Sequence, residues 1–335
     1  PGGWPPGRSR GRARGGGGRG GGEVGGRGWM TTEEGGGGGA SEIGRGATGR
    51  KTPRGCAPHF TSHIRQTLED TYTPEDLYSR GLRVYTTVDP VFQEVAMRAV
   101  NAHLLVLDEA LEYAPYLANR QQVVAGNASP DRLEAYLQSA LVMMENRTGY
   151  VRAFVGGRDY AYNQFSHVTQ ARRQPGSVFK PMVFTAAWEH GLTPQTKVID
   201  EPWSLGDWTP ENYISGVYSG EVDFQEAVVR SLNIPTARAM NEMMGPTGPQ
   251  DVVDLARRLG IRGYLPPFPA LSLGVAEVTL MEMTAAYTAF ANLGTRVTPV
   301  TVRHVVTLDG QILEEHAPER VPSLDPQVAH MTNLV

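Results

Sequence analysis

The feature that most constrains this chain is the start of one helix, where a serine is followed three residues later by a lysine. A Pro-Gly turn precedes Ser177, and apolar residues then recur at helical spacing up to a glycine stop at Gly191. Pro181 is tolerated only near the first turn of a helix, so the helix begins within a residue or two of Ser177. Ser177 and Lys180 therefore share one face of this helix.

Two interpretations of this helix start are open. In the structural one, Ser177 caps the helix, as serine commonly does. A capping box would place Glu or Gln at the third position, whereas this chain has Lys180, which the positive end of the helix dipole opposes. The same field favours a neutral amine, and a neutral lysine beside a hydroxyl can activate a serine nucleophile. Only three of the 31 Lys and Arg are lysines, and arginine cannot act as a base. We therefore predict Ser177 as a nucleophile and Lys180 as its base.

A chain of 335 residues is long enough for two domains, or for one large domain with appendages. The net charge of −4 is unevenly spread, because residues 1–54 hold ten Lys and Arg against four Glu. The remainder is acidic, so nucleic acid is not an expected partner of it. Cys56 is the only cysteine, which excludes an intrachain disulfide and a cysteine metal cluster. No apolar run is long enough for a transmembrane helix, and no signal-peptide pattern opens the chain.

The first 56 residues form a low-complexity segment rich in Gly and Arg. With almost no large apolar side chains, this segment cannot offset its ordering entropy, and we expect it to be disordered. Arg-Gly tracts can bind RNA. The alternatives are a flexible linker and a stretch that is not authentic coding sequence.

From residue 58 onward the pattern predicts a mixture of helices and strands. A strand is expected at 81–88, and hairpins are expected at 140–155 and at 300–314, the second around Asp309-Gly310. We expect residues 114–134 to be a polar, irregular excursion. Helices are expected at 58–70, 90–112, 177–190, 223–231, 235–244, 249–259, 279–293 and from Asp325-Pro326 to Val335.

A second polar constellation, Ser231-Leu232-Asn233, lies between two of these helices. Pro235 prevents the first helix from continuing, and a tight turn there can aim a hydroxyl and an amide into a cleft. The structural alternative is an ordinary helix stop. Its position after the Ser177 helix favours the functional interpretation.

The order S-x-x-K then S-x-N resembles the first two motifs of penicilloyl-serine transferases. Further similarity lies in residues 81–89, 169–181, 208–213 and 273–279. Together these segments resemble the transpeptidase domain of class A, bifunctional penicillin-binding proteins. The resemblance covers residues 57–335 and implies an α+β fold, with an antiparallel sheet flanked by helices.

That resemblance implies a peptidoglycan D,D-transpeptidase, with D-Ala-D-Ala carboxypeptidase chemistry, that needs no cofactor or metal. Ser177 would attack the penultimate D-Ala carbonyl of a stem peptide, with Lys180 as base. Ser231 would relay a proton to the leaving group, and Asn233 would bind the substrate amide and hold Lys180. β-Lactams would acylate Ser177 as covalent inhibitors. The implied location is extracytoplasmic, and other cell-wall synthesis proteins are expected partners.

The sequence departs from the family pattern at both ends. The third motif, K-T/S-G on a sheet strand, is absent, and so are the upstream glycosyltransferase domain and membrane anchor. We therefore expect an incomplete domain that is weakened alone, since losing one oxyanion donor typically costs about 10²–10³ in rate. Two alternatives are a serine β-lactamase, although no E-x-x-L-N segment is present, and a non-catalytic β-lactam sensor or scaffold.

Overall fold

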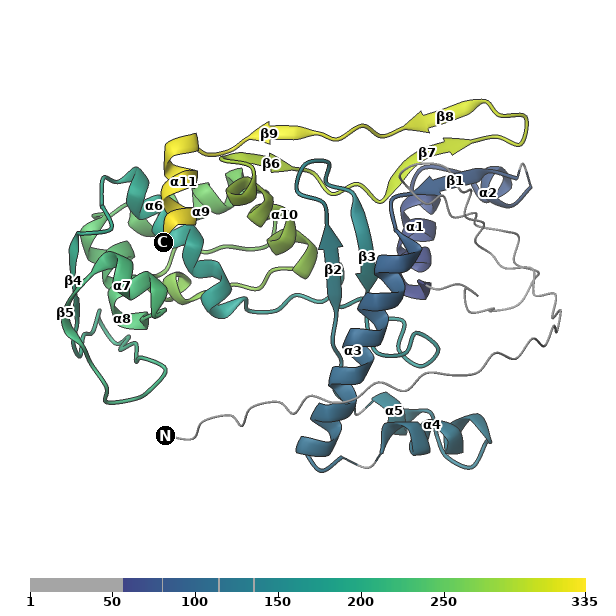
Figure 1. Cartoon of the computed structure of the whole chain (residues 1–335), viewed down its shortest axis with the longest axis horizontal. Helices are drawn as coiled ribbons and strands as arrows, with labels where there is room; N and C mark the ends of the chain where they lie inside the picture. The colour runs from purple at the N-terminus through teal and green to yellow at the C-terminus, as the bar shows by residue number, and fades with distance from the viewer. Residues whose placement is uncertain (1–56, 80, 114, 135) are drawn as a thin grey trace, which may run out of the picture.

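The structure is a computed structural model that describes residues 57–79, 81–113, 115–134 and 136–335 (Figure 1). The predicted disorder of residues 1–56, including Cys56, lies outside these ranges. Helices and helical turns alternate with short strands along the chain. The helices are α1 Pro58–Glu69, α2 Pro74–Ser79, α3 Pro90–Ala110, α4 Tyr116–Val124, α5 Asp131–Glu134, α6 Lys180–Glu189, α7 Phe224–Val229, α8 Asn233–Arg238, α9 Gly248–Arg258, α10 Leu280–Ala291 and α11 Pro326–Leu334.

Strands are short, and every pair of them runs antiparallel. In the described part of the chain they form one three-stranded sheet, β1-β7-β8, and the pairs β2-β3, β4-β5 and β6-β9. The predicted class, antiparallel strands flanked by helices, is confirmed. The strands are β1 Arg83–Thr86, β2 Leu141–Met144, β3 Val151–Val155, β4 Lys197–Asp200, β5 Gly220–Asp223, β6 Thr295–Val297, β7 Val302–Val306, β8 Ile312–Glu315 and β9 Arg320–Pro322.

Buried polar side chains join the separate sheets. The Oγ1 of Thr87 lies 2.9 Å from the carbonyl oxygen of Val151 and 2.8 Å from that of Val300. It therefore connects the chain after β1 to β3 and to the segment before β7. On α3, the Gln93 amide pairs with the backbone of Phe154, donating to its carbonyl at 3.0 Å and accepting from its N–H at 2.7 Å. Because buried polar groups need partners, these contacts fix α3 against β3.

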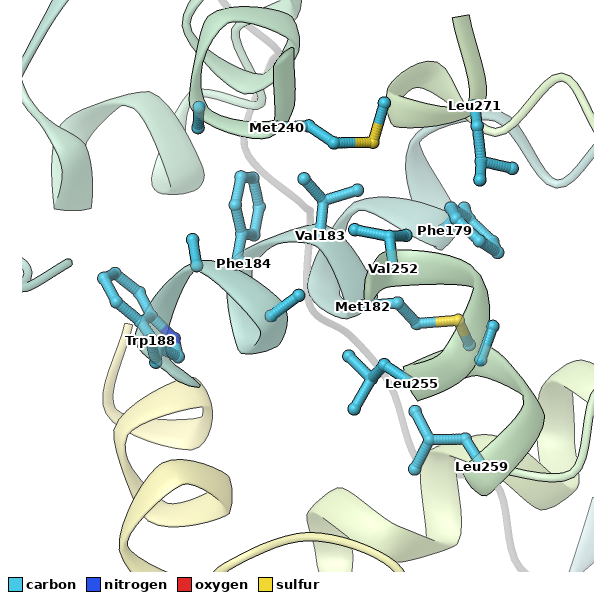
Figure 2. Packing of buried hydrophobic residues seen from close by; sticks show 14 of the residues in the cluster. Phe179, Met182, Val183, Phe184, Trp188, Met240, Val252, Leu255, Leu259 and Leu271 are labelled. Carbon is cyan, nitrogen blue, oxygen red and sulfur yellow. The ribbon is translucent and has the colours of Figure 1, made fainter. Parts of the chain in front are cut away.

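Helix α6 lies at the centre of the largest core. Apolar side chains occur on every face of this helix and its side chains from Met182 to Trp188 are buried, which is the pattern of a core helix. Figure 2 shows its Met182, Val183, Phe184 and Trp188, with Phe179 just before it, among the side chains of the surrounding elements. The burial of α6 extends to its first residue, Lys180. The neighbours labelled in the figure are Met240, Val252, Leu255, Leu259 and Leu271.

Two predictions from the sequence need correction. Residues 114–134 are not irregular, because they contain α4 and α5. Tyr116, Leu133 and Tyr136 form a small buried cluster that fixes these helices. The other residues of the two helices are mostly polar, so the sequence shows no clear apolar periodicity there. The helix predicted at 235–244 begins earlier, at Asn233, and becomes a π-helical turn at Ala239–Met243. Pro235 sits in the first turn of the new helix, where it is tolerated.

Elements α2, β4, β5, β6 and β9 had no counterpart among the predictions. Each of these strands has only three or four residues, too few for an alternating pattern to stand out. Of the helices in the described ranges, none has the length and apolar character needed to cross a membrane.

Candidate active site

The turn that carries Ser177 is a short 3-10 helix, Gly176–Phe179, directly before α6. Its start depends on a close approach between two glycines. Gly176 has φ of +57° and donates its N–H to the carbonyl oxygen of Gly274 at 3.1 Å. A Cβ on Gly274 would lie 2.2 Å from the carbonyl oxygen of Gly176, so only glycine fits there. The Oη of Tyr287 on α10 donates to the Val178 carbonyl oxygen at 2.6 Å. The turn is therefore held from two sides.

Lys180 is the first residue of α6 and is 1% exposed. Its Nζ contacts three acceptors: the Ser231 carbonyl oxygen at 2.7 Å, the Ser231 Oγ at 3.0 Å and the Asn233 Oδ1 at 2.7 Å. Burial, which penalises the charged amine, lowers the pKa of Lys180 to about 8. An amine with this pKa is neutral in an appreciable fraction of molecules near neutral pH and can accept a proton.

Ser231 presents two of these oxygens because its backbone is left-handed, with φ of +53°. It is the residue after the C-cap of α7, and the bonds from Ser231 N–H to Val228 O and from Leu232 N–H to Ala227 O form a Schellman motif. Glycine is usual at this position, whereas serine there carries a conformational cost. A strained non-glycine residue of this kind is often found at a functional site.

Asn233 begins α8, and its side-chain amide can face Lys180 in only one orientation. Its Nδ2 donates to the Glu211 carbonyl oxygen at 2.7 Å. A carbonyl oxygen accepts and cannot donate, so the Asn233 Oδ1 must be the end that faces Lys180. The S-x-N turn thus offers three oxygens to a single buried amine.

The four residues predicted for the site divide into a connected trio and a neighbour. The Lys180 amine lies within hydrogen-bonding distance of both Ser231 and Asn233, which joins these three residues. Ser177 lies on the adjoining turn with an exposed side chain that makes no hydrogen bond in the described part of the chain. The chemical roles of all four remain predictions.

Gly274 and Tyr287 hold the Ser177 turn and were missed as site residues by the sequence argument. Gly274 lies in a segment already noted for its family resemblance, but its contact with Gly176 depends on folding of distant parts of the chain. Tyr287 gave no signal, since a tyrosine on an apolar helix is read as core. Among the described residues, no cluster of three or more His, Cys, Asp or Glu could hold a metal ion. Serine hydroxyls beside a buried lysine are groups that can supply acid-base and nucleophilic chemistry.

Comparison with protein families decides what kind of domain carries this arrangement. The family described as penicillin binding protein transpeptidase domain matches residues 139–333, which is more than half of the chain. The chain belongs to this family. The matched range contains the Ser177 turn, Lys180 and the S-x-N turn, and the resemblance inferred from the sequence is confirmed.

Known relatives of this penicillin-binding transpeptidase domain include penicillin-binding protein 1A of Aquifex aeolicus. The two are 37% identical over 190 residues, which are 55% of this chain and 25% of that protein. The chain therefore spans about a quarter of the length of the curated relative that it matches.

Solved structures agree with this assignment. Penicillin-binding protein 1A from Haemophilus influenzae has the same fold, with a TM-score of 0.70 at 20% identity over 82% of this chain and 57% of that one. PonA1 from Mycobacterium tuberculosis, solved in complex with penicillin V, gives a TM-score of 0.63 at 26% identity over 82% of this chain and 69% of that one.

Proposed function

We propose that this domain is a peptidoglycan D,D-transpeptidase that works through an acyl-enzyme on Ser177. The observation that carries the proposal is the buried amine of Lys180, which has a lowered pKa and lies one turn from an exposed serine. Family membership supports the reaction class. The substrate is a stem peptide ending in D-Ala-D-Ala, and β-lactams acylate the same serine.

The proposed reaction begins when neutral Lys180 takes the proton of the Ser177 hydroxyl. The Ser177 Oγ forms a bond to the penultimate D-Ala carbonyl carbon, and the resulting oxyanion is stabilised by backbone N–H donors such as that of Ser177. As the C–N bond to the terminal D-Ala breaks, the leaving amine receives a proton through the Ser231 hydroxyl. An amine from a neighbouring stem then attacks the ester and restores Ser177.

The hydrogen bonds of Lys180 fit both of its protonation states. A charged amine has three hydrogens for its three acceptors. A neutral amine has two, and then the Ser231 hydroxyl can donate to the Nζ lone pair at the same 3.0 Å separation. The site can thus exchange a proton between Lys180 and Ser231 without moving either residue.

The first test is covalent labelling of the full-length protein by fluorescent penicillin. Wild-type protein should be labelled, and Ser177→Ala should abolish the label because it removes the hydroxyl that is assigned as the nucleophile, whereas the Ser231 hydroxyl, which also contacts Lys180, is assigned to proton relay. Ser323→Ala is a matched control, because Ser323 is a buried serine far along the chain from these residues that donates to the Val321 carbonyl oxygen. Labelling that persists in Ser177→Ala would refute the nucleophile assignment.

The second test follows the rate of labelling against pH. The active form of Lys180 is neutral, so the rate should rise as pH increases through the pKa of about 8 and then level off. Lys180→Arg keeps the positive charge but removes the base, and we expect a loss of about 10²–10⁴ in rate. A pH-independent rate, or an arginine variant with unchanged acylation, would contradict the role of Lys180 as base.

For the whole protein, the family points to a cell-wall enzyme that acts outside the cytoplasm, and we extend that location to this chain as part of the proposal. Peptidoglycan is its substrate, and other cell-wall synthesis proteins are its partners. Incubating the full-length protein with isolated peptidoglycan and analysing cross-linked stem peptides tests the transfer step. Release of free D-Ala without new cross-links would contradict transpeptidation and would show carboxypeptidase activity instead.

A further inference from the structure

The S-x-N turn is supported from behind by an asparagine from another loop. The Oδ1 of Asn212 accepts the backbone N–H of Asn233 at 3.0 Å and lies 3.4 Å from that of Ile234. These are the first N–H groups of α8, and the residue that precedes the helix, Leu232, has no side-chain oxygen to cap them. Asn212 therefore caps the N-terminus of α8, although it lies about 20 positions earlier in the chain.

The orientation of the Asn212 amide is fixed by what lies on its other side. Its Nδ2 donates to the Asp200 Oδ1 at 2.7 Å and to the Val217 carbonyl oxygen at 3.2 Å. Both are acceptors, so the amide oxygen must point toward the turn. Asp200, at the end of β4, is fully buried, and its Oδ2 accepts the Ser219 N–H at 3.0 Å. Burying a carboxyl group costs free energy unless the group is hydrogen-bonded, and these contacts give a donor to each of the Asp200 oxygens.

The same loop holds Asn233 at a second point. Glu211, directly before Asn212, accepts the Asn233 Nδ2 through its backbone carbonyl oxygen. Asn233 is thus fixed by its backbone and by its side-chain amide, from two consecutive residues. Its Oδ1 is left as an acceptor for Lys180.

These contacts form a directed chain of hydrogen bonds. Lys180 donates to Asn233, the Asn233 backbone donates to Asn212, and the Asn212 amide donates to Asp200. Each group can take only the donor or acceptor role that it has, so the chain specifies where the Asn233 oxygen lies beside the amine. Lys180 and Asp200 at the two ends of this chain are buried and the two asparagines between them are half-buried, and a hydrogen-bonded network in such surroundings rigidifies a site.

We propose that Asp200 and Asn212 are positioning residues for acylation, which act on Lys180 by fixing the S-x-N turn and the Asn233 amide. The inference rests on the proposed function, because it assigns these residues to the same acyl-enzyme site. Neither residue touches the serine or the amine. Their effect is to hold the turn at a geometry in which proton transfer between Lys180, Ser231 and Ser177 is fast.

The experiment measures the second-order rate constant for acylation by fluorescent penicillin in the full-length protein, from pH 6 to pH 10. Asn212→Asp replaces the donating Nδ2 with an oxygen that faces the oxygen of Asp200. We expect the rate to fall about 10–100-fold, since a misplacement of about 1 Å can cost 10²-fold. Asn212→Ala removes the contacts without placing two oxygens against each other, and we expect its acylation rate to fall by a similar factor.

A reciprocal exchange tests the chain itself. The double variant Asp200→Asn with Asn212→Asp restores one hydrogen bond between the two side chains, reversed in direction. It also keeps acceptors for the Asn233 and Ser219 N–H groups, but the Val217 carbonyl oxygen loses the donor that Asn212 supplies. We therefore expect a partial recovery, with an acylation rate at least about threefold above that of Asn212→Asp, a coupling that residues in one network show and independent residues do not.

The pH profile separates positioning from a general loss of stability. In Asn212→Ala the Asn233 oxygen is no longer held against Lys180, so the charged amine loses an acceptor and its pKa falls further. The midpoint of the profile should therefore move to lower pH while the plateau rate drops. Burial is the cause of the lowered pKa of Lys180, and the Asn233 oxygen is one of the three acceptors that its amine contacts.

Asp108→Asn is the matched control, because Asp108 is also a buried carboxylate but pairs with Arg158 in another part of the fold. It should lower the melting temperature without moving the pH midpoint. Folded Asn212 variants with the wild-type rate and midpoint would overturn the inference, as would a folded exchange variant that recovers nothing. A wild-type protein that penicillin does not label would instead overturn the proposed function, so the two failures are distinguishable.

Discussion

At the residue scale, the informative position is Ser231, where the backbone favours glycine but the site needs a hydroxyl. Several helices in the described part of the chain end on left-handed glycines, among them Gly126, Gly191 and Gly260. Helix α7 ends instead on Ser231, with φ of +53°. The left-handed conformation costs a non-glycine residue about 1–2 kcal/mol. That cost is compensated by placing the Ser231 carbonyl oxygen and Oγ on the same lysine amine.

Two substitutions at Ser231 separate strain from chemistry. Both Ser231→Ala and Ser231→Gly remove the hydroxyl, so both should acylate more slowly than wild type, by about 10²–10⁴ if Ser231 relays the proton. Ser231→Gly should nevertheless be more stable than Ser231→Ala by about 1 kcal/mol, because glycine adopts positive φ freely. Thermal unfolding and penicillin labelling of the two variants measure these effects.

Glu112 provides the matched position for this comparison. It follows α3 with φ of +56°, and the bonds from its N–H and that of Tyr113 close the same type of motif. Glu112→Gly should also be more stable than Glu112→Ala by about 1 kcal/mol, with acylation unchanged in both. Equal stability of the glycine and alanine variants at Ser231 would argue against strain there.

The four candidate site residues could be singled out from the sequence by the order S-x-x-K then S-x-N and by the family resemblance, and their roles stay predictions. A lysine at the third position of a helix start, in a chain with three lysines, is a local signal that survives without a structure. The sign of φ at Ser231 and the roles of Asp200 and Asn212 could not be predicted. They depend on which distant loops meet behind the turn, and spacing along the chain carries no information on that.

At the element scale, the Ser177 turn depends on how closely η3, the 3-10 helix Pro269–Leu273, approaches η1, Gly176–Phe179. Gly274 caps η3 with φ of +71°, and the space beyond its Cα is filled by the backbone of Gly176. The two turns can meet this closely only because Gly274 lacks a side chain, whereas a Cβ on Gly176 would meet open space and glycine is favoured there by its φ of +57°. Sequence periodicity predicted the helix that follows but not this contact, because neither glycine belongs to a periodic pattern.

Gly274→Ala should therefore displace the nucleophile turn. The new Cβ would meet backbone atoms, which cannot rotate away as a side chain does, so we expect about 2–4 kcal/mol of destabilisation and at least a tenfold slower acylation. Gly191→Ala is the matched control, since Gly191 has φ of +85° but open space around its Cα. It should lose only the strain energy, about 1–2 kcal/mol, and keep its acylation rate. Equal effects of the two substitutions on acylation would contradict the close-approach argument.

The helices that could be predicted from the sequence are those whose local pattern matches their packing. Helices α6 and α10 are apolar, long and bounded by turn signals, so their packing and their local preferences agree. Helices α4 and α5 escaped prediction because only a few residues anchor them. Arg120 of α4, for example, reaches Asp159 at 2.6 Å, a contact between positions 39 residues apart that no local pattern contains.

At the scale of the whole molecule, the apolar core is divided into unequal parts. The large cluster surrounds α6 and supports the site, while smaller clusters lie around α1, α3 and β3 (Figure 1). In the smaller part, Arg158 and Asp108 form a buried ion pair, with side chains 3% and 4% exposed. The Arg158 guanidinium also lies 3.8 Å from the centroid of the Tyr116 ring. This pair joins α3, α4 and the segment after β3.

Breaking that pair should weaken the fold without touching the chemistry. Asp108→Asn leaves the Arg158 charge buried without its counter-ion, which costs about 3–5 kcal/mol, and the melting temperature should fall clearly. Glu94→Gln is the matched control on the same helix, because Glu94 and Arg98 are both about 70% exposed and such pairs contribute at most about 0.5 kcal/mol. Acylation per folded molecule should equal wild type in both variants, since neither residue belongs to the core that surrounds α6. A slower acylation in fully folded Asp108→Asn protein would instead mean that the two parts of the molecule are coupled, and that the smaller part helps to set the geometry of the Ser177 turn.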